Sequence, residues 1–118
     1  MQVETLKDLV VEALDDQKAV DVAVLDVREV ASFTDFMVIA SGTSRRHVKS
    51  LADRVVERAR DAGVRALGVE GTEVAEWVLI DLGDVVVHVM QPTIRGFYSL
   101  EKLWSPDMPA SGDLEAGG

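Results

Sequence analysis

Two runs of apolar and β-branched residues, separated by only three residues, constrain the fold of this chain more than any other feature. Residues 76–81 (EWVLID) and 85–90 (VVVHVM) flank the segment Leu82-Gly83-Asp84. Runs of this composition favour β-strands, and a short linker that contains glycine is typical of a β-hairpin. The sequence therefore predicts an antiparallel pair of strands over residues 76–90.

A further apolar run, residues 36–40 (FMVIA), has no polar residue within it. Such a run is typical of a strand that is buried on both faces of a sheet. Helical spacing and β-branched composition predict helices at residues 3–17 and between Ser44 and Gly63, and strands at 20–27 and 64–69. Pro92 at a first helical position predicts one or two short final helices that continue to Trp104. This order of elements predicts an α/β (α+β) fold with a mixed sheet of about five strands and helices packed on it.

Length and composition predict one folded domain. The chain has 118 residues, of which 47% are apolar, and this is enough for a single hydrophobic core. We assign residues 1–104 to that domain. Residues 105–118 (SPDMPASGDLEAGG) contain two prolines and three glycines and almost nothing to bury. We expect them to form a disordered tail.

Several classes of protein are excluded by what the chain lacks. It has no cysteine, which excludes disulfides, thiolate zinc sites and cysteine nucleophiles. Its first residues, MQVETLKDLV, do not show the basic segment and apolar run of a signal peptide. No uncharged stretch approaches the ~20 apolar residues of a membrane-spanning helix. We therefore expect a cytoplasmic protein.

Charge is distributed unevenly along the chain. The net charge is −9, yet residues 45–65 contain seven basic and three acidic residues and so carry +4. The rest of the chain carries −13. An excess of acid argues against direct binding to a nucleic-acid backbone but suits a basic protein partner.

The turn of residues 41–46, from Ser41 to Arg46, allows two interpretations. Residues 41–44 (SGTS) join a predicted strand to a predicted helix, and free backbone N–H groups at a helix start bind anions. One interpretation is a nucleotide-binding enzyme of nucleotidyltransferase type that uses this turn. The segment matches neither the P-loop nor the dinucleotide fingerprint. We favour a simple turn with a helix cap.

The search for catalytic and metal-binding residues finds no convincing set. Nucleotidyltransferases hold Mg²⁺ through two or three carboxylates, and only Asp81 and Asp84 are candidates here. His47 is expected to be solvated, and His88 lies in the middle of a strand without a second matched ligand for zinc. We therefore predict no enzyme activity, no metal and no cofactor.

The two faces of the predicted hairpin differ in composition, because alternate residues of a strand share a face. One face is aliphatic and is predicted to form core; it comprises Val78, Ile80, Val87 and Val89. The other face comprises Trp77, Leu79, His88 and Met90. It is either a partner-binding surface or is covered by the chain's own terminal helix. The residues that would cover it are Phe97, Tyr98, Leu100, Leu103 and Trp104.

Two long segments resemble the ribosomal silencing factor family, also called Iojap-like. They are residues 34–53 (TDFMVIASGTSRRHVKSLAD) and 75–104 (AEWVLIDLGDVVVHVMQPTIRGFYSLEKLW). The resemblance covers about residues 6–104, and the two segments together are far more specific than a short motif. Met37 and Met90 stand where aromatic residues or leucine are common in the family.

The resemblance implies a function and a set of binding residues. It implies a nucleotidyltransferase-like fold without a catalytic site. The expected function is translation inhibition: the protein binds the large ribosomal subunit at ribosomal protein fourteen, blocks joining of the small subunit and slows translation under nutrient limitation. Some members of the family form homodimers. The residues that we expect to bind the partner are Trp77, Leu79, Asp81, His88, Met90 and Tyr98.

The basic helix also allows two interpretations. Arg45 and Arg46 are candidates for a contact with ribosomal RNA next to the protein partner. The alternative, which we favour, is a solvated helix face whose charges form ion pairs with neighbouring acids. A small homodimeric scaffold that uses the hairpin face for its own contact is a third hypothesis for the whole chain.

Overall fold

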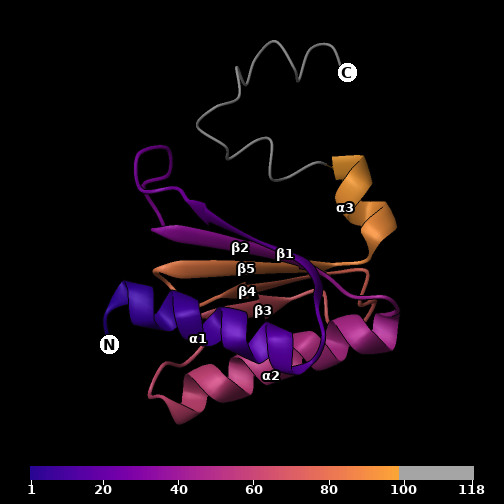
Figure 1. The fold of residues 1–118 in the computed structure, drawn as a ribbon, viewed down its shortest axis with the longest axis horizontal. Helices are drawn as coiled ribbons and strands as arrows, with labels where there is room; N and C mark the ends of the chain where they lie inside the picture. Colours follow the sequence, from indigo (N-terminus) through magenta and orange to yellow (C-terminus); the bar gives the residue numbers. More distant parts are fainter. Residues whose placement is uncertain (99–118) are drawn as a thin grey trace.

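Two adjacent strands whose residues are all buried form the centre of the fold. They are β2 (Phe36–Ser41) and β5 (Val85–Met90), and they pair in parallel. The computed structural model describes residues 1–98. Within these residues the chain forms a five-stranded sheet in the order β1-β2-β5-β4-β3, and its other pairings are antiparallel (Figure 1). The outer strands are β1 (Val20–Asp26), β4 (Trp77–Asp81) and β3 (Gly68–Glu70). The predicted mixed sheet is confirmed.

The predicted hairpin is formed by β4 and β5. Val78 lies opposite Val89, and Ile80 lies opposite Val87. Gly83 makes the turn with a φ of +88°, a conformation that glycine adopts without strain. The backbone N–H of Gly83 donates to a carboxylate oxygen of Asp81 at 2.8 Å, which closes the turn.

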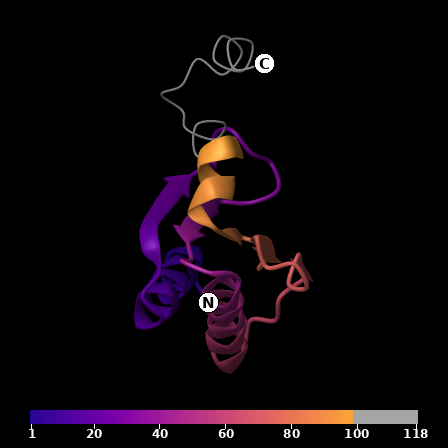
Figure 2. The same ribbon diagram turned by 90° about the vertical axis from the view of Figure 1, so that its right-hand side faces the viewer.

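Two helices cover one face of the sheet, α1 (Val3–Asp16) and α2 (Arg45–Asp61) (Figures 1 and 2). Ser44 caps α2, because its hydroxyl accepts from the backbone N–H of His47 at 3.1 Å. Gly63, with a φ of +91°, follows the end of the helix. The core between helices and sheet is aliphatic, as predicted for this side of the hairpin; its most buried large residues include Val10, Leu14, Val38, Leu51, Val55, Val78 and Ile80.

The opposite face of the sheet is covered only in part. A short helix, α3 (Pro92–Tyr98), lies on this side, away from α1 and α2 (Figure 2). Its residue Ile94 packs against a small second core. That core consists of Val27, Met37, Ile39 and Met90. The hydroxyl of Ser41 accepts from a guanidinium N–H of Arg95 at 2.9 Å and ties α3 to the end of β2.

Some predicted boundaries differ from the structure. The strand predicted at residues 64–69 is reduced to the three residues of β3. Residues 64–67 form the connection between the end of α2 and β3. The final helix begins at Pro92, as predicted from the preference of proline for a first helical position. Residues 99–104, the tail at 105–118 and the side chains of Phe97 and Tyr98 lie outside the described part. No helix among residues 1–98 is long and apolar enough to cross a membrane.

Candidate partner-binding surface

Five of the six residues predicted to bind a partner lie on the face of the hairpin that α1 and α2 leave uncovered. Three cross-strand pairs form this side of β4 and β5, and in each pair the two Cα atoms lie directly opposite. The pairs are Trp77 with Met90, Leu79 with His88, and Asp81 with Val86. Because paired residues of a sheet share a face, all six side chains belong to one side. The predicted grouping of Trp77, Leu79, His88 and Met90 on one face is confirmed.

Only the β4 half of this group lies at the surface. Trp77, Leu79 and Asp81 are half-buried, whereas His88 is 6% exposed and Met90 is 0% exposed. The expectation that His88 and Met90 lie open on this face is therefore corrected. Met90 belongs to a buried core that it shares with Ile39 of β2, and Ile94 of α3 packs against this core. His88 and Met90 lie beside the exposed group, on the adjoining strand β5, and contribute little to the exposed surface.

We refer to Trp77, Leu79 and Asp81, together with Glu70, as the β4 surface. Glu70 joins the group because β3 places it opposite Leu79. Tyr98, also predicted to bind the partner, is the last residue of α3, and its side chain lies outside the described part. The β4 surface thus combines a half-buried indole and a leucine with two carboxylates at its edge.

Trp77 forms a side-chain hydrogen bond with a residue of the adjoining strand β5. Its indole Nε1–H donates to Nδ1 of His88 at 3.0 Å, and the two ring centroids lie 5.9 Å apart. Burial lowers the pKa of His88 to about 4, because desolvation penalises the imidazolium. His88 is therefore neutral near pH 7. Acceptance at Nδ1 places its proton on Nε2.

The surroundings of the β4 surface are acidic. Residues 66–94 contain five acidic residues and neither lysine nor arginine; the acids are Glu70, Glu73, Glu76, Asp81 and Asp84. Three large apolar residues near this edge of the sheet are exposed, namely Leu67 (75%), Val69 (38%) and Val74 (57%), although Val69 lies opposite Ile80 and so belongs to the helix-side face. Apolar side chains bordered by one sign of charge suit a partner of the opposite charge. Our sequence analysis did not single out these three residues, although the stretch without a basic residue was visible in the sequence.

The turn at residues 41–44 forms its polar contacts within the chain. The backbone N–H of Thr43 donates to Nδ1 of His47 at 2.9 Å, and Nε2 of His47 lies 2.7 Å from the carbonyl oxygen of Gln17. The expectation of a solvated His47 is therefore wrong, because its ring joins this turn to the end of α1. Gly42 is needed here, since a Cβ would lie 2.8 Å from a methyl group of Val48. The geometry is that of the turn and helix cap that we favoured.

Carboxylates and histidines do not converge among residues 1–98, where no group of three could hold a metal ion. Asp81 binds the hairpin turn through its carboxylate. The backbone carbonyl of Asp84 accepts from the N–H groups of Asp35 and Phe36. The histidines His47 and His88 lie on different elements and have separate hydrogen-bond partners.

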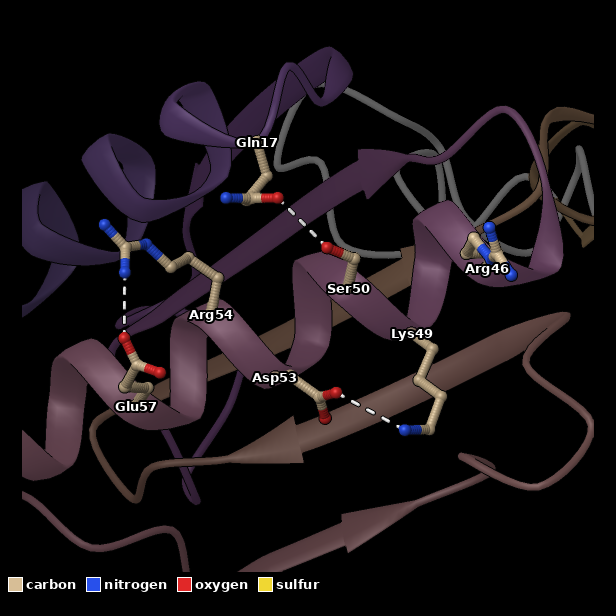
Figure 3. A pocket seen from close by; sticks show the side chains of 7 residues that line it. All are labelled: Gln17, Arg46, Lys49, Ser50, Asp53, Arg54 and Glu57. Carbon is tan, nitrogen blue, oxygen red and sulfur yellow. Dashed lines mark hydrogen bonds and ion pairs between the residues drawn. The ribbon is translucent and has the colours of Figure 1, made fainter.

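Most cations of α2 are paired with acids, in agreement with the interpretation we favoured. Arg58 forms an ion pair with Asp16 of α1 at 2.6 Å, and Arg45 forms one with Glu76 at 3.0 Å. A shallow groove of about 570 Å³ lies along the exposed side of α2 (Figure 3). Lys49 pairs with Asp53 within this groove. Arg46 also lines the groove, is exposed, and makes no ion pair within residues 1–98.

Comparison with known proteins decides the family. The family model described as "Ribosomal silencing factor during starvation" matches residues 1–116. The chain belongs to the ribosomal silencing factor family. This confirms the resemblance carried by the two long segments, and it places the chain among regulatory proteins associated with the ribosome.

Relatives in bacteria and in mitochondria support this assignment. The ribosomal silencing factor of Chromobacterium violaceum is 44% identical over 93% of this chain and 90% of its own length. A crystal structure of a protein from the same organism has a TM-score of 0.87, 43% identity, and covers 92% of this chain and 93% of its own. A mouse protein, "Mitochondrial assembly of ribosomal large subunit protein 1", is 35% identical over 83% of this chain and 44% of its own length. The silencing factor fold is thus shared along nearly the whole chain.

Proposed function

We propose that this silencing factor binds the large ribosomal subunit at ribosomal protein fourteen and prevents the small subunit from joining. Translation then slows when nutrients are scarce. The β4 surface supports this proposal: a half-buried indole and a leucine, bordered by acids, lie on a face of the sheet that α1 and α2 do not cover. The name of the mouse relative, which refers to assembly of the large subunit, agrees with the choice of subunit.

Charge supports a protein rather than RNA as the main partner. The segment that contains the β4 surface has five acids, of which Glu76 is paired with Arg45, and neither lysine nor arginine, and such a surface repels a phosphate backbone. Basic ribosomal proteins carry the complementary charge, which steers association and favours the correct orientation. The main contact is therefore with a ribosomal protein, and ribosomal RNA makes no more than a secondary contact next to it. Since ribosomes act in the bacterial cytoplasm and bacterial relatives match most of the chain, we place the protein there.

Steric blocking needs no chemistry from the silencing factor. A protein that occupies the surface where the small subunit docks excludes that subunit by volume alone. Its affinity must come from a few well-placed side chains, and aromatic residues at the centre of an interface often contribute most. Trp77 is the aromatic residue in this position, and its indole is already held before the partner arrives.

A secondary contact with ribosomal RNA, if formed, is better assigned to Arg46 than to Arg45. Arg45 is engaged by Glu76 at 3.0 Å, so its charge is neutralised locally. Arg46 is exposed at the start of α2 without an ion pair in the described residues. We keep a homodimer as part of the proposal, and light scattering of the free protein, compared with its complex with the large subunit, tests it.

Co-sedimentation with isolated large subunits tests the main proposal. We expect the wild-type protein to sediment with large subunits and Trp77→Ala to lose at least tenfold in affinity, as for an aromatic hot spot. Phe33→Ala is a matched control, because Phe33 is an aromatic residue that is 59% exposed near the other end of the sheet. Failure of the wild type to sediment rejects the function, and wild-type affinity of Trp77→Ala rejects the β4 surface.

A further inference from the structure

His88 is an unusual residue for its position in the sheet. The strand β5 is otherwise made of valines and one methionine, and every one of its residues is buried. On the same face His88 has Val86 and Met90 as its strand neighbours, with Ile39 and Leu79 opposite it on the adjoining strands. An aliphatic side chain would avoid the cost of burying an imidazole. The residue therefore needs a reason beyond packing.

The imidazole of His88 forms one specific contact with the β4 surface. Nδ1 of His88 accepts from the indole Nε1–H of Trp77 at 3.0 Å. Only a neutral imidazole with its proton on Nε2 can accept in this way. The burial that keeps His88 neutral is also what makes it an acceptor. The hydrogen bond thus connects a buried residue of β5 to a half-buried residue of β4.

Among the further contacts of Trp77, one fixes the adjoining backbone and one lies along its ring. The backbone next to it is fixed, because the N–H of Gln91 donates to the carbonyl of Glu76 at 2.9 Å. The ring packs against the second core, which includes Met90. Apolar contacts limit the position of an indole but do not select which edge of the ring faces inward. A directional hydrogen bond to Nε1 does select that edge.

We propose that His88 is a positioning residue, which holds the indole of Trp77 in the one orientation that the β4 surface presents to its partner. This inference rests on the proposed function. The benefit is preorganisation: a side chain that is already fixed loses less freedom on binding, which is worth about fivefold in affinity for one large side chain. His88 itself does not contact the partner.

Two substitutions at position 88 separate positioning from core packing. His88→Leu keeps an apolar side chain in the core but removes the acceptor. His88→Asn is smaller and packs less well, but its side-chain oxygen can accept from the indole near the place of Nδ1. If His88 only fills space, Leu is the better replacement. If His88 positions Trp77, Asn is the better replacement for binding.

The first readout is the indole N–H of Trp77 in the free protein, observed by NMR and assigned with Trp77→Phe. We expect hydrogen exchange of this N–H to accelerate at least tenfold in His88→Leu and to stay within about threefold of wild type in His88→Asn, as a lost and a retained hydrogen bond would give. Thermal unfolding checks that both variants are folded. An indole resonance and exchange rate unchanged in His88→Leu overturn the inference.

The second readout is affinity for isolated large subunits. We expect His88→Leu to bind about fivefold more weakly and His88→Asn to bind nearly as wild type. In a Trp77→Phe background, which lacks the N–H donor, His88→Leu should have no further effect. If Trp77→Ala binds large subunits more weakly than wild type but His88→Leu binds with wild-type affinity, the inference is overturned. Wild-type affinity of Trp77→Ala instead rejects the β4 surface, and absence of any wild-type binding rejects the proposed function together with the positioning role.

Discussion

The two faces of the β4–β5 hairpin are made from the same strands but have different compositions and surroundings. On the helix side, Val78, Ile80, Val87 and Val89 are all 0% exposed and lie in one aliphatic core. On the other side, Trp77, Leu79 and Asp81 stay half-buried above His88 and Met90. The first face gains stability from complete burial of apolar surface. The second gives up part of that gain and leaves an indole partly exposed, as the proposed recognition role requires.

The two faces of the hairpin also differ in their polar groups. The helix-side core of the hairpin contains no polar side chain in the described residues, whereas the other face includes a histidine, a carboxylate and an indole N–H. Each of these polar groups has a hydrogen-bond partner: His88 pairs with Trp77, and Asp81 pairs with Gly83. A buried polar group without a partner would cost free energy. The face that we propose for recognition is therefore also the face with organised hydrogen bonds.

The largest expected difference in stability is between substitutions at two adjacent residues of β4 whose side chains lie on opposite faces of the sheet. Ile80→Ala should lower the free energy of unfolding by roughly 3–4 kcal/mol, because it leaves a cavity in the closed core. Leu79→Ala should cost about 1 kcal/mol, because Leu79 is already half-exposed. Urea unfolding measures both. Equal losses would show that the two faces contribute alike to stability.

Acid should destabilise the fold through the recognition side. His88 has a pKa of about 4 in the fold and 6.5 ordinarily, so the unfolded chain binds its proton more readily. Above pH 6.5 the imidazole is neutral in both states and does not lower the free energy of unfolding. As the pH falls from 6.5 to 4, the unfolded chain takes up the proton first, and the free energy of unfolding drops by about 3 kcal/mol in total. Urea unfolding across this range measures the loss.

Matched variants identify the group that is responsible. His88→Leu should remove most of the pH dependence between 6.5 and 4. Asp26 has a pKa lowered to about 2 by its hydrogen bonds with Arg28, so Asp26→Asn should lower stability by a constant amount above pH 3.8 and alter the pH dependence only below 3.8. A steep pH dependence that persists in His88→Leu would assign the effect to another group.

The turn before β4 should be sensitive to a single methyl group. Gly71 has a φ of +90°, and a Cβ there would collide with the backbone carbonyl of Trp77. We expect Gly71→Ala to destabilise by about 2–3 kcal/mol through backbone strain and displacement of β4. Gly68→Ala is the control, because a Cβ at Gly68 meets open space. Thermal unfolding of the two variants should separate them, and similar melting temperatures would contradict this account of the turn.

The smallest expected effects concern the two arginines at the start of α2. Arg45→Ala should change stability by no more than about 0.5 kcal/mol, because its ion pair with Glu76 is exposed. Arg46→Ala should leave stability unchanged but reduce the salt dependence of binding to large subunits by about one unit of slope, if it contacts a phosphate. Sedimentation at several salt concentrations measures this slope. An equal change in the salt dependence of binding for Arg45→Ala and Arg46→Ala would contradict the assignment of a phosphate contact to Arg46 alone.

Much of the fold follows from local patterns. The hairpin, the doubly buried β2 and the two long helices were predicted because alternation, continuous apolar runs and helical spacing are local properties of the chain. The strand at residues 64–69 was predicted too long, because its length depends on where the cap of α2 releases the chain and where β4 begins. Neither is a property of that segment alone.

The candidate surface was predicted only in part, for a similar reason. Alternation placed Trp77, Leu79, His88 and Met90 on one face, and this is correct. It could not show that Met90 is enclosed by residues from other elements, such as Ile39 and Ile94. Nor could it show that His47 reaches Gln17, or that Arg45 pairs with a residue 31 positions away.

The sequence by itself determined the membership of the silencing factor family, the sheet with its helices, and the division of the hairpin into two faces. These depend on residue types and their spacing, which the chain carries at every stage of folding. The tertiary structure decided which residues of the second face remain exposed and that the indole of Trp77 donates to His88. It also decided that Arg46 makes no ion pair with any residue of the described range 1–98. Burial and pairing arise when distant segments pack together, so they exist only in the folded chain.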